Sequence, residues 1–462
     1  MISQELDLAD LRSRLIAWLQ GKMPQARNLA ISGMERSGGG QSHDSFLLNL
    51  TWQEDGQERS EGMVLRCAPR SNPVYPDYNL GNQFHVMERL QGTGVPVPKV
   101  YWLEEDDKVL GASFYLMGKI DGILIRDFPP YHTFGPYFDA TPAKRARMWW
   151  SSLETIAKVH KLGWKRLRLS FLGVSKGGTG PLDREIEYWE RYLNWAKEEP
   201  QPILEATLDW LKENRYVPER VTLCWGDCRI GNMIYSPDGE VVGALDWEMA
   251  YLGDPVSDLT FFLFSDWMTS EAYGIPRLEG SPEREETVQR YQELVGWKAE
   301  NLFYQEVMTA LRLGIVTLKV QKNLRKFGAA IPSDDIDTNN VYTQRLASLL
   351  DLPAPGPPLR GVTRVEEVTV TVQLHLTGPG GGDWYAVCDR GKATRHQGTA
   401  AEPNCTLTVA AEDWAAIQRG EMDRMRAWME GRLKIDGDMT LLLQLENTIS
   451  KLGGRQPGLE AN

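Results

Sequence analysis

The first third of the chain contains several short stretches in which apolar residues dominate or alternate with polar ones, a pattern typical of β-strands. Glycine, proline and acidic residues separate these stretches and favour turns between them. Strands are predicted at residues 31–34, 46–52, 63–66, 100–102 and 113–117. Helices are predicted at residues 6–19 and 83–90. We therefore expect the N-terminal region to be rich in β-structure.

Helical periodicity dominates the middle of the chain. Leu153, Ile156, Ala157 and His160 recur at the spacing of one helix face within residues 143–160. Further helices are predicted at residues 285–294, 301–322 and 342–350. Because His160 falls on an apolar face, we expect a hydrogen-bonded core histidine there, and a catalytic role is the alternative.

Proline dominates residues 351–358, which mark the clearest linker in the chain. Beyond this linker, strands are predicted at residues 367–377, 384–389 and 405–409, and helices at residues 413–419, 422–429 and 439–452. A glycine triplet at residues 380–382 separates the first two of these strands. This mixture indicates a separate, small α+β domain.

Two short apolar strands, at residues 233–235 and 241–245, flank a segment with strong turn chemistry. Pairing these strands would bring Asn232 and Asp246 together, because they stand at the open ends of the hairpin. An amide oxygen and a carboxylate are hard ligands that suit Mg²⁺.

Asp227 precedes Asn232 with four residues between them, which is the spacing of the aspartate and asparagine in a kinase-type catalytic loop. Phosphoryl transfer needs one carboxylate to orient a hydroxyl, and an amide plus a carboxylate to hold Mg²⁺ on the nucleotide phosphates. We therefore predict Asp227 as the catalytic residue and Asn232 and Asp246 as metal ligands. The alternative is a turn-rich hairpin with solvated acids.

Residues 37–44 form a glycine-rich segment between two predicted strands. Glycines allow a backbone to lie against a phosphate chain, although a flexible hairpin turn would have the same composition. Arg66, one strand later, adds a cation for the same purpose. The predicted nucleotide-binding residues are Gly39, Gly40, Gln41, Ser42, Arg66 and Met117, the last because the strand at residues 113–117 would lead into a hinge over the base.

Gly253-Asp254-Pro255 is typical of a helix start, with Asp254 as the N-cap and Pro255 at the first helical position. Asp258 then falls in the first turn, and we expect structural roles for both aspartates. Cys224 and Cys228 are close enough in sequence to suggest metal ligands, but no second pair with metal spacing accompanies them. We expect them to pack around the catalytic loop, with zinc binding as the alternative.

Composition narrows the classes of function. The chain has 462 residues and a formal net charge of −12, which argues against general nucleic-acid binding. No apolar run approaches the length that spans a bilayer, and the first residues lack a secretory pattern. Five scattered cysteines are typical of reduced thiols. We therefore expect a cytoplasmic protein without a membrane span.

The ordered set of motifs resembles the aminoglycoside phosphotransferase-like kinase superfamily, closest to the branch fused to acyl-CoA dehydrogenases. The pieces are Gly40-Gln41-Ser42, Val64-Leu65-Arg66, residues 93–98, 114–117 and 156–160, and the signature from Trp225 to Asp258. The resemblance covers about residues 30–350. It implies an α+β, bilobal, protein-kinase-like fold with a β-rich N-lobe at 1–117 and a mostly helical C-lobe at 118–350.

Carried over position by position, the resemblance implies that Asp227 is the catalytic aspartate and that Asn232 and Asp246 bind Mg²⁺. Arg66 stands where many relatives have a phosphate-binding lysine, and Gln83 where a glutamate would pair with it. The usual ion pair would then become a hydrogen bond between Arg66 and Gln83. Trp225 replaces the histidine of the common His-Gly-Asp.

After the linker at 351–360, residues 361–455 resemble the sterol-carrier-protein-2-like fold, chiefly through residues 431–439. Such domains surround an apolar tunnel that suits lipid or acyl groups. The alternative is a docking or dimerisation module, which would allow a homodimer.

Together these features predict an ATP- and Mg²⁺-dependent kinase that phosphorylates a hydroxyl of a small, hydrophobic or acyl-type molecule, such as a lipid or acyl-CoA-like compound. One alternative is an aminoglycoside or antibiotic kinase. Another is a non-catalytic kinase fold that serves as a lipid-binding scaffold. The sequence leaves open the acceptor, the choice of ATP or GTP, and the oligomeric state.

Overall fold

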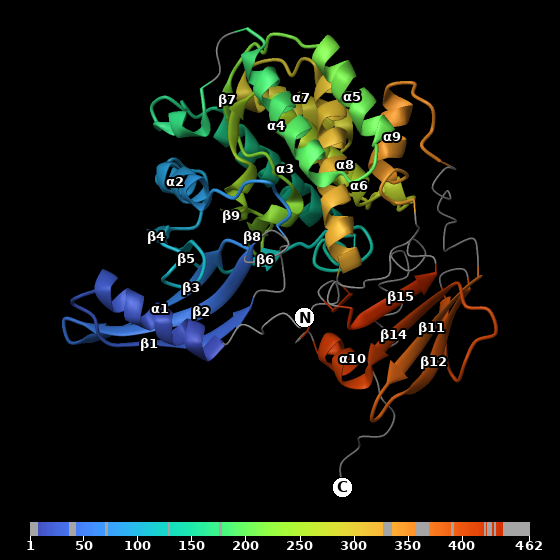
Figure 1. Ribbon diagram of the computed structural model, residues 1–462, viewed down its shortest axis with the longest axis horizontal. Coiled ribbons are helices and arrows are strands. Elements are labelled where there is room, and N and C mark those ends of the chain that lie inside the picture. Colours follow the sequence, from blue (N-terminus) through green and yellow to red (C-terminus); the bar gives the residue numbers. More distant parts are fainter. Residues whose placement is uncertain are drawn as a thin grey trace.

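The structure is a computed structural model that describes residues 8–36, 43–69, 73–127, 130–174, 178–326, 335–356, 369–389, 392–419, 422, 427–428 and 431–437. Figure 1 shows a β-rich N-terminal part, a helical middle and a C-terminal part built on a second sheet. The predicted fold class is confirmed.

The N-terminal part is a five-stranded antiparallel sheet with one helix packed on it. Its strand order is β1-β2-β3-β5-β4. Helix α1 (Leu8–Lys22) turns Leu11, Leu15 and Leu19 into an apolar cluster formed with β2, β3 and β5. The strands are β1 (Arg27–Arg36), β2 (Asp44–Glu54), β3 (Gln57–Cys67), β4 (Val100–Glu104) and β5 (Phe114–Gly118), and helix α2 (Leu80–Leu90) lies between β3 and β4.

The chain crosses from this sheet to the middle part immediately after β5. Strand β6 (Ile123–Leu124) pairs with β8 (Met233–Tyr235), which pairs with β9 (Val241–Ala244). The backbone at Gly122 passes so close to Ile234 that a Cβ there would clash with the isoleucine side chain. The crossing is therefore tight, as expected for a hinge between two lobes.

Helices make up most of the middle part. They are α3 (Pro142–His160), α4 (Gly180–Ala196), α5 (Pro202–Glu213), α6 (Val256–Met268), α7 (Arg284–Val295), α8 (Leu302–Lys326) and α9 (Val341–Leu349), with short turns η1 (Leu169–Leu172), η2 (Ile230–Asn232), η3 (Trp247–Met249) and η4 (Glu271–Tyr273). A two-stranded sheet joins β7 (Thr222–Cys224) to β10 (Tyr251–Gly253). Two apolar clusters, one around α3 and one around α8, form the core.

The C-terminal part is a mixed sheet of order β13-β12-β11-β14-β15, with helix α10 (Ala411–Gln418) beside it. Its strands are β11 (Thr369–Thr377), β12 (Gly382–Asp389), β13 (Lys392–Gln397), β14 (Cys405–Ala410) and β15 (Leu433–Gly437). Strands β11 and β14 run parallel, and the other pairs are antiparallel. Val320 of α8 packs against the apolar cluster of this part, so α8 contacts it directly.

Most predicted elements occur where the sequence places them. No prediction covered α4, α5, β6, β10, β13 or β15. Helix α6 begins at Val256, one residue later than predicted. The Asp254 carboxylate nevertheless accepts a hydrogen bond from the backbone N–H of Val256, which is the capping contact predicted for Asp254.

Some predictions lie outside the described residues, namely the helix at 439–452 and most of the helix at 422–429. The lobe, linker and C-terminal domain boundaries stay predictions. Within the part of the chain that the structure describes, no helix is long and apolar enough to cross a bilayer.

Candidate active site

The predicted hairpin is confirmed and brings Asn232 and Asp246 to adjacent strand ends. Met233 pairs with Ala244, and the backbone N–H of Leu245 donates to the carbonyl of Asn232 at 2.9 Å. Asp246 follows directly with a φ of 62°, a left-handed conformation that is strained for a residue with a side chain. The turn at Asp246 ends β9 beside Asn232.

Asp227 lies on the loop between β7 and η2, and both of its carboxylate oxygens are engaged. Asn232 Nδ2 donates to Asp227 Oδ2 at 2.7 Å, and Arg229 Nε donates to Asp227 Oδ1 at 2.8 Å. The same Asn232 nitrogen also donates to the Asp227 carbonyl at 2.9 Å. Because the amide nitrogen is turned to Asp227, the amide oxygen of Asn232 is the atom left to bind a cation.

The two carboxyl groups of the site differ in the direction of their pKa shifts. Burial and the neighbouring carboxylate of Asp246 raise the pKa of Asp227 to about 8. Burial by itself would raise the pKa of Asp246, but Arg66, His43 and Arg229 hold it below its ordinary value. Arg66 forms an ion pair with Asp246 directly.

These residues fit a divalent cation. An amide oxygen and a carboxylate stand at adjacent strand ends, and two nearby carboxylates repel one another in a buried setting. A cation beside Asp246 would relieve that repulsion, and Mg²⁺ prefers oxygen ligands of this kind. Asn232 and Asp246 would hold it.

Asp258 of α6 holds the backbone of the loop that carries Asp227. Its carboxylate accepts hydrogen bonds from the backbone N–H groups of Trp225 at 2.6 Å and Gly226 at 2.9 Å. The ring of His160 lies between Asp258, 3.0 Å from its Nε2, and the Tyr291 hydroxyl, 2.7 Å from its Nδ1. The predicted structural roles of Asp258 and His160 are confirmed.

Trp225 and Gly226 shape the loop just before Asp227. The Trp225 ring stacks on Trp247 with centroids 4.9 Å apart and an interplanar angle of 11°. Its indole N–H donates to the carbonyl of Leu245 at 2.8 Å, which ties the loop to the end of β9. Gly226 has a φ of 87°, and a Cβ there would clash with the Met249 carbonyl, so the position requires glycine.

The two cysteines flanking this loop are buried thiols packed against backbone. Cys224 Sγ donates to the Asp254 carbonyl at 3.4 Å, and Cys228 Sγ to the Asp258 carbonyl at 3.1 Å. Burial raises the pKa of both thiols well above the ordinary value. The predicted packing role is confirmed.

The predicted hydrogen bond between Arg66 and Gln83 is wrong, because a third side chain lies between them. His43 lies between the two side chains, with Nδ1 3.1 Å from Arg66 Nη2 and Nε2 3.0 Å from Gln83 Nε2. The imidazole thus separates the Gln83 amide from the guanidinium. Burial would lower the pKa of Arg66, but Asp246, Tyr115 and Glu248 raise it.

The other predicted nucleotide-binding residues divide into two groups. Met117 is buried on β5, where it pairs with Val64 of β3 and Val100 of β4 just before the crossing between lobes. Gly39, Gly40, Gln41 and Ser42 lie outside the described residues.

Four residues of the site were not predicted. Arg229 pairs with Asp127, which follows β6, as well as with Asp227. A Cβ on Gly231 would clash with Asp127, so the glycine admits this contact. Three of the four stand close in sequence to predicted site residues. Arg229 follows Asp227 by two residues, His43 lies in the glycine-rich segment, and Glu248 follows Asp246 by two residues. No local signal marked Asp127.

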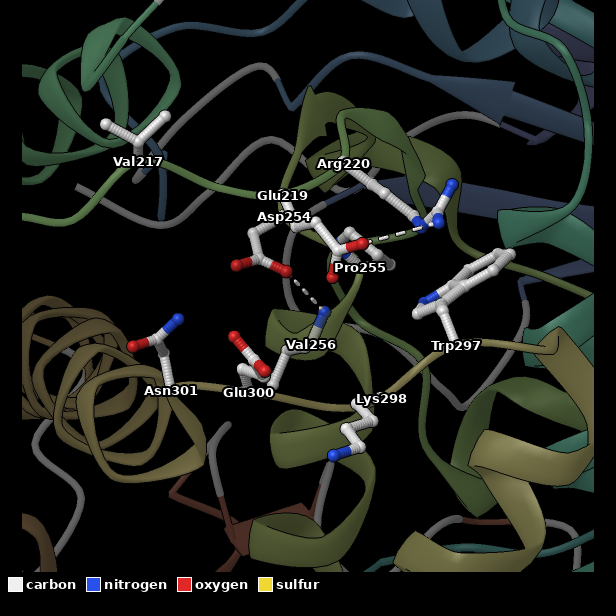
Figure 2. Close-up of a pocket in the computed structure, with 10 residues that line it drawn as sticks. All are labelled: Val217, Glu219, Arg220, Asp254, Pro255, Val256, Trp297, Lys298, Glu300 and Asn301. Carbon is white, nitrogen blue, oxygen red and sulfur yellow. Dashed lines mark hydrogen bonds and ion pairs between the residues drawn. The ribbon is translucent and has the colours of Figure 1, made fainter.

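A separate pocket lies at the N-terminal end of α6, away from these groups. Figure 2 shows that Arg220, Trp297, Asp254 and Lys298 are among its lining residues. Arg220 lies over the Trp297 ring at 4.8 Å. Acidic and basic side chains alternate around it, and neither Asp227, Asn232 nor Asp246 lines it.

Comparison with known proteins identifies the family. Residues 34–301, more than half of the chain, match the profile of the Phosphotransferase enzyme family. The chain belongs to this family. Residues 360–450 match the SCP-2 sterol transfer family, so the chain also carries a domain of that type.

The chain matches only part of each of the longer proteins to which it is similar. Human acyl-CoA dehydrogenase family member 11 is 29% identical over 255 residues, covering 52% of this chain and 30% of that protein. The chicken protein of the same name is 30% identical over 270 residues, covering 57% of this chain and 32% of that protein. The chain thus spans about a third of the length of these relatives.

Two further similarities concern the fold and the C-terminal part. A crystal structure of a candidate aminoglycoside phosphotransferase from Ralstonia eutropha has a TM-score of 0.54 at 22% identity, covering 73% of this chain and 96% of that chain. It shows the fold alone. Human sterol carrier protein 2 is 35% identical over 72 residues, covering 15% of this chain and 13% of that protein.

Proposed function

We propose that this phosphotransferase is an ATP- and Mg²⁺-dependent kinase that phosphorylates a hydroxyl of a small, hydrophobic or acyl-type molecule. The observation that carries the proposal is the convergence of Asp227, Asn232 and Asp246 at the open end of one hairpin. An amide, a carboxylate and a second, buried carboxylate are the groups that phosphoryl transfer requires.

Each side chain has a distinct role in this proposal. Asp227, held at both oxygens by Asn232 and Arg229, orients the acceptor hydroxyl and takes its proton late in the transfer. Asn232 and Asp246 hold the cation, and Arg66 contacts the phosphates. When bound, ATP with Mg²⁺ supplies the phosphoryl group and offsets its developing charge.

The C-terminal domain supports the choice of acceptor class. A match to the SCP-2 sterol transfer family favours a lipid-like or acyl acceptor that such a domain could bind. An aminoglycoside is the alternative acceptor, and it predicts that expression of the chain protects a sensitive bacterium.

The test is phosphorylation of a metabolite extract, read as a mass gain of one phosphoryl group. Asp227→Asn and Asp246→Asn should each lower the rate by at least about a hundredfold while the circular dichroism spectrum stays native. Asp238→Asn is the matched control, because Asp238 is exposed on the turn of the same hairpin. Full activity in either active-site variant would contradict the proposal.

One observation favours a second candidate, a kinase fold without catalysis that serves as a scaffold. The Arg66 guanidinium pairs with Asp246, a proposed metal ligand, and so competes with a cation. Calorimetry with ATP and Mg²⁺ separates the two candidates, since a scaffold would show no Mg²⁺-dependent nucleotide binding.

A further inference from the structure

His43, in the glycine-rich segment, contacts residues of β3, α2 and η3. Its side chain is 1% exposed. Nδ1 lies 3.1 Å from Arg66 Nη2 of β3 and 2.8 Å from Glu248 Oε2 of η3, while Nε2 lies 3.0 Å from Gln83 Nε2 of α2. Because Nε2 faces an amide N–H donor, it accepts from Gln83, and the ring hydrogen on Nδ1 faces Glu248. The imidazole therefore links α2 to η3, with Arg66 beside this link.

The far end of this bridge is itself anchored. Gln83 is 2% exposed, and the Tyr115 hydroxyl of β5 donates to its Oε1 at 3.2 Å. This contact turns the Gln83 amide nitrogen toward His43. Tyr78 packs edge-on against the imidazole, with centroids 5.2 Å apart and an interplanar angle of 78°. The ring is thus fixed by partners on several sides.

The bridge engages a carboxylate that lies beside Arg66. The guanidinium already pairs with Asp246, and Glu248 Oε2 lies 3.7 Å from its Nη2. The contact of His43 with Glu248 therefore reduces the competition of Glu248 for the guanidinium.

We propose that His43 is a positioning residue that, through the bridge Tyr115–Gln83–His43, holds Glu248 off the Arg66 guanidinium and so keeps Arg66 available to the nucleotide phosphates. This inference rests on the proposed kinase function. Without the imidazole, Glu248 loses its Nδ1–H partner and turns to Arg66, whose Nη2 lies 3.7 Å from Glu248 Oε2. A phosphate chain and Mg²⁺ must then displace a tighter ion pair.

The experiment is calorimetric titration of the full chain with a non-hydrolysable ATP analogue at several Mg²⁺ concentrations. His43→Ala should weaken nucleotide binding about tenfold and raise the Mg²⁺ concentration needed for half-maximal binding. His43→Gln, whose amide N–H can contact Glu248, should recover part of the loss. A merely structural role would lower stability without changing the Mg²⁺ requirement.

His85→Ala is the matched control. His85 is a half-exposed histidine on α2 whose Nδ1 lies 3.2 Å from Glu88, away from the site. Its replacement should leave nucleotide binding unchanged.

The outcomes distinguish a failure of this inference from a failure of the proposed function. No Mg²⁺-dependent binding by the unaltered chain would overturn both. Normal binding by the unaltered chain together with unchanged binding by His43→Ala would overturn the role of His43 alone. If His43→Ala loses its native circular dichroism spectrum, Gln83→Met tests the role of His43 instead. This variant keeps the side-chain length and removes the hydrogen bond to His43. Unchanged nucleotide binding in Gln83→Met would also overturn the inference.

Discussion

Glu185 of α4 gives the molecule a pH dependence that can be tested without any substrate. The side chain is 7% exposed, and burial raises the pKa of this carboxyl to about 7. Arg312 acts in the opposite direction, and Asp254 adds to the rise. The cost of ionising Glu185 inside the fold should therefore appear as stability lost on raising the pH.

The sign and size follow from proton linkage. The unfolded chain releases this proton near 4.5, whereas the native chain holds it to about 7, so the native state binds more protons between these values. The free energy of unfolding must then fall as the pH rises through this window and level off above it. At about 1.4 kcal/mol for each tenfold change in proton affinity, the loss amounts to about 3 kcal/mol.

The assay is urea unfolding followed by tryptophan fluorescence at several pH values between 4.5 and 8. Glu185→Gln imitates the protonated side chain, so it should unfold at higher urea than the unaltered chain at pH 8 and equally at pH 4.5. Glu187→Gln is the control, because Glu187 is exposed on the same helix. An identical pH slope in the unaltered chain and in Glu185→Gln would refute the reasoning.

Substitutions at three further positions test the support of the loop that carries Asp227. Asp258→Ala leaves two buried N–H groups and the His160 ring without their acceptor, so unfolding should become easier by about 3–5 kcal/mol; a loss below about 1 kcal/mol by urea unfolding would contradict the contacts. Trp225→Phe should cost about 1–3 kcal/mol, because it removes the indole hydrogen bonds and part of the ring volume but keeps an aromatic ring against Trp247, whereas Trp225→Ala should cost about 3–5 kcal/mol by removing the stacked ring, and equal losses would argue against the stacking. Gly231→Ala should lower the thermal midpoint and the phosphorylation rate together, because its Cβ displaces Asp127 from Arg229; Gly21→Ala, with open space around it, should do neither.

The hairpin that carries Asn232 and Asp246 could be predicted because its information is local. Turn residues at 236–239 and two apolar strands define the pairing, and the pairing alone places Asn232 beside Asp246. The surroundings of Asp246 could not be predicted in the same way, since Arg66 is 180 residues away in sequence and meets it only through the folded sheet. His43 stands in the glycine-rich segment, but its contact with Glu248 likewise depends on the folded chain.

The missed elements have different causes. Leu182, Ile186, Trp189 and Leu193 recur at helical spacing in α4, so the sequence does contain a signal for this helix. Strand β13 has no such signal. It is a short, polar strand that pairs with β12 at the edge of the described sheet, and an edge strand needs no apolar face.

Helix α8 contacts both the loop that carries Asp227 and the C-terminal sheet, which the sequence predicts to be a separate domain. Arg312 in its middle donates to the Gly226 carbonyl at 2.8 Å, next to Asp227, and Val320 farther along packs into the core of the C-terminal sheet. Val320 lies eight positions after Arg312, which corresponds to about 12 Å along the helix axis. A tilt of this helix would move both contacts at once, so a displacement of the C-terminal sheet would be transmitted directly to the loop that carries Asp227.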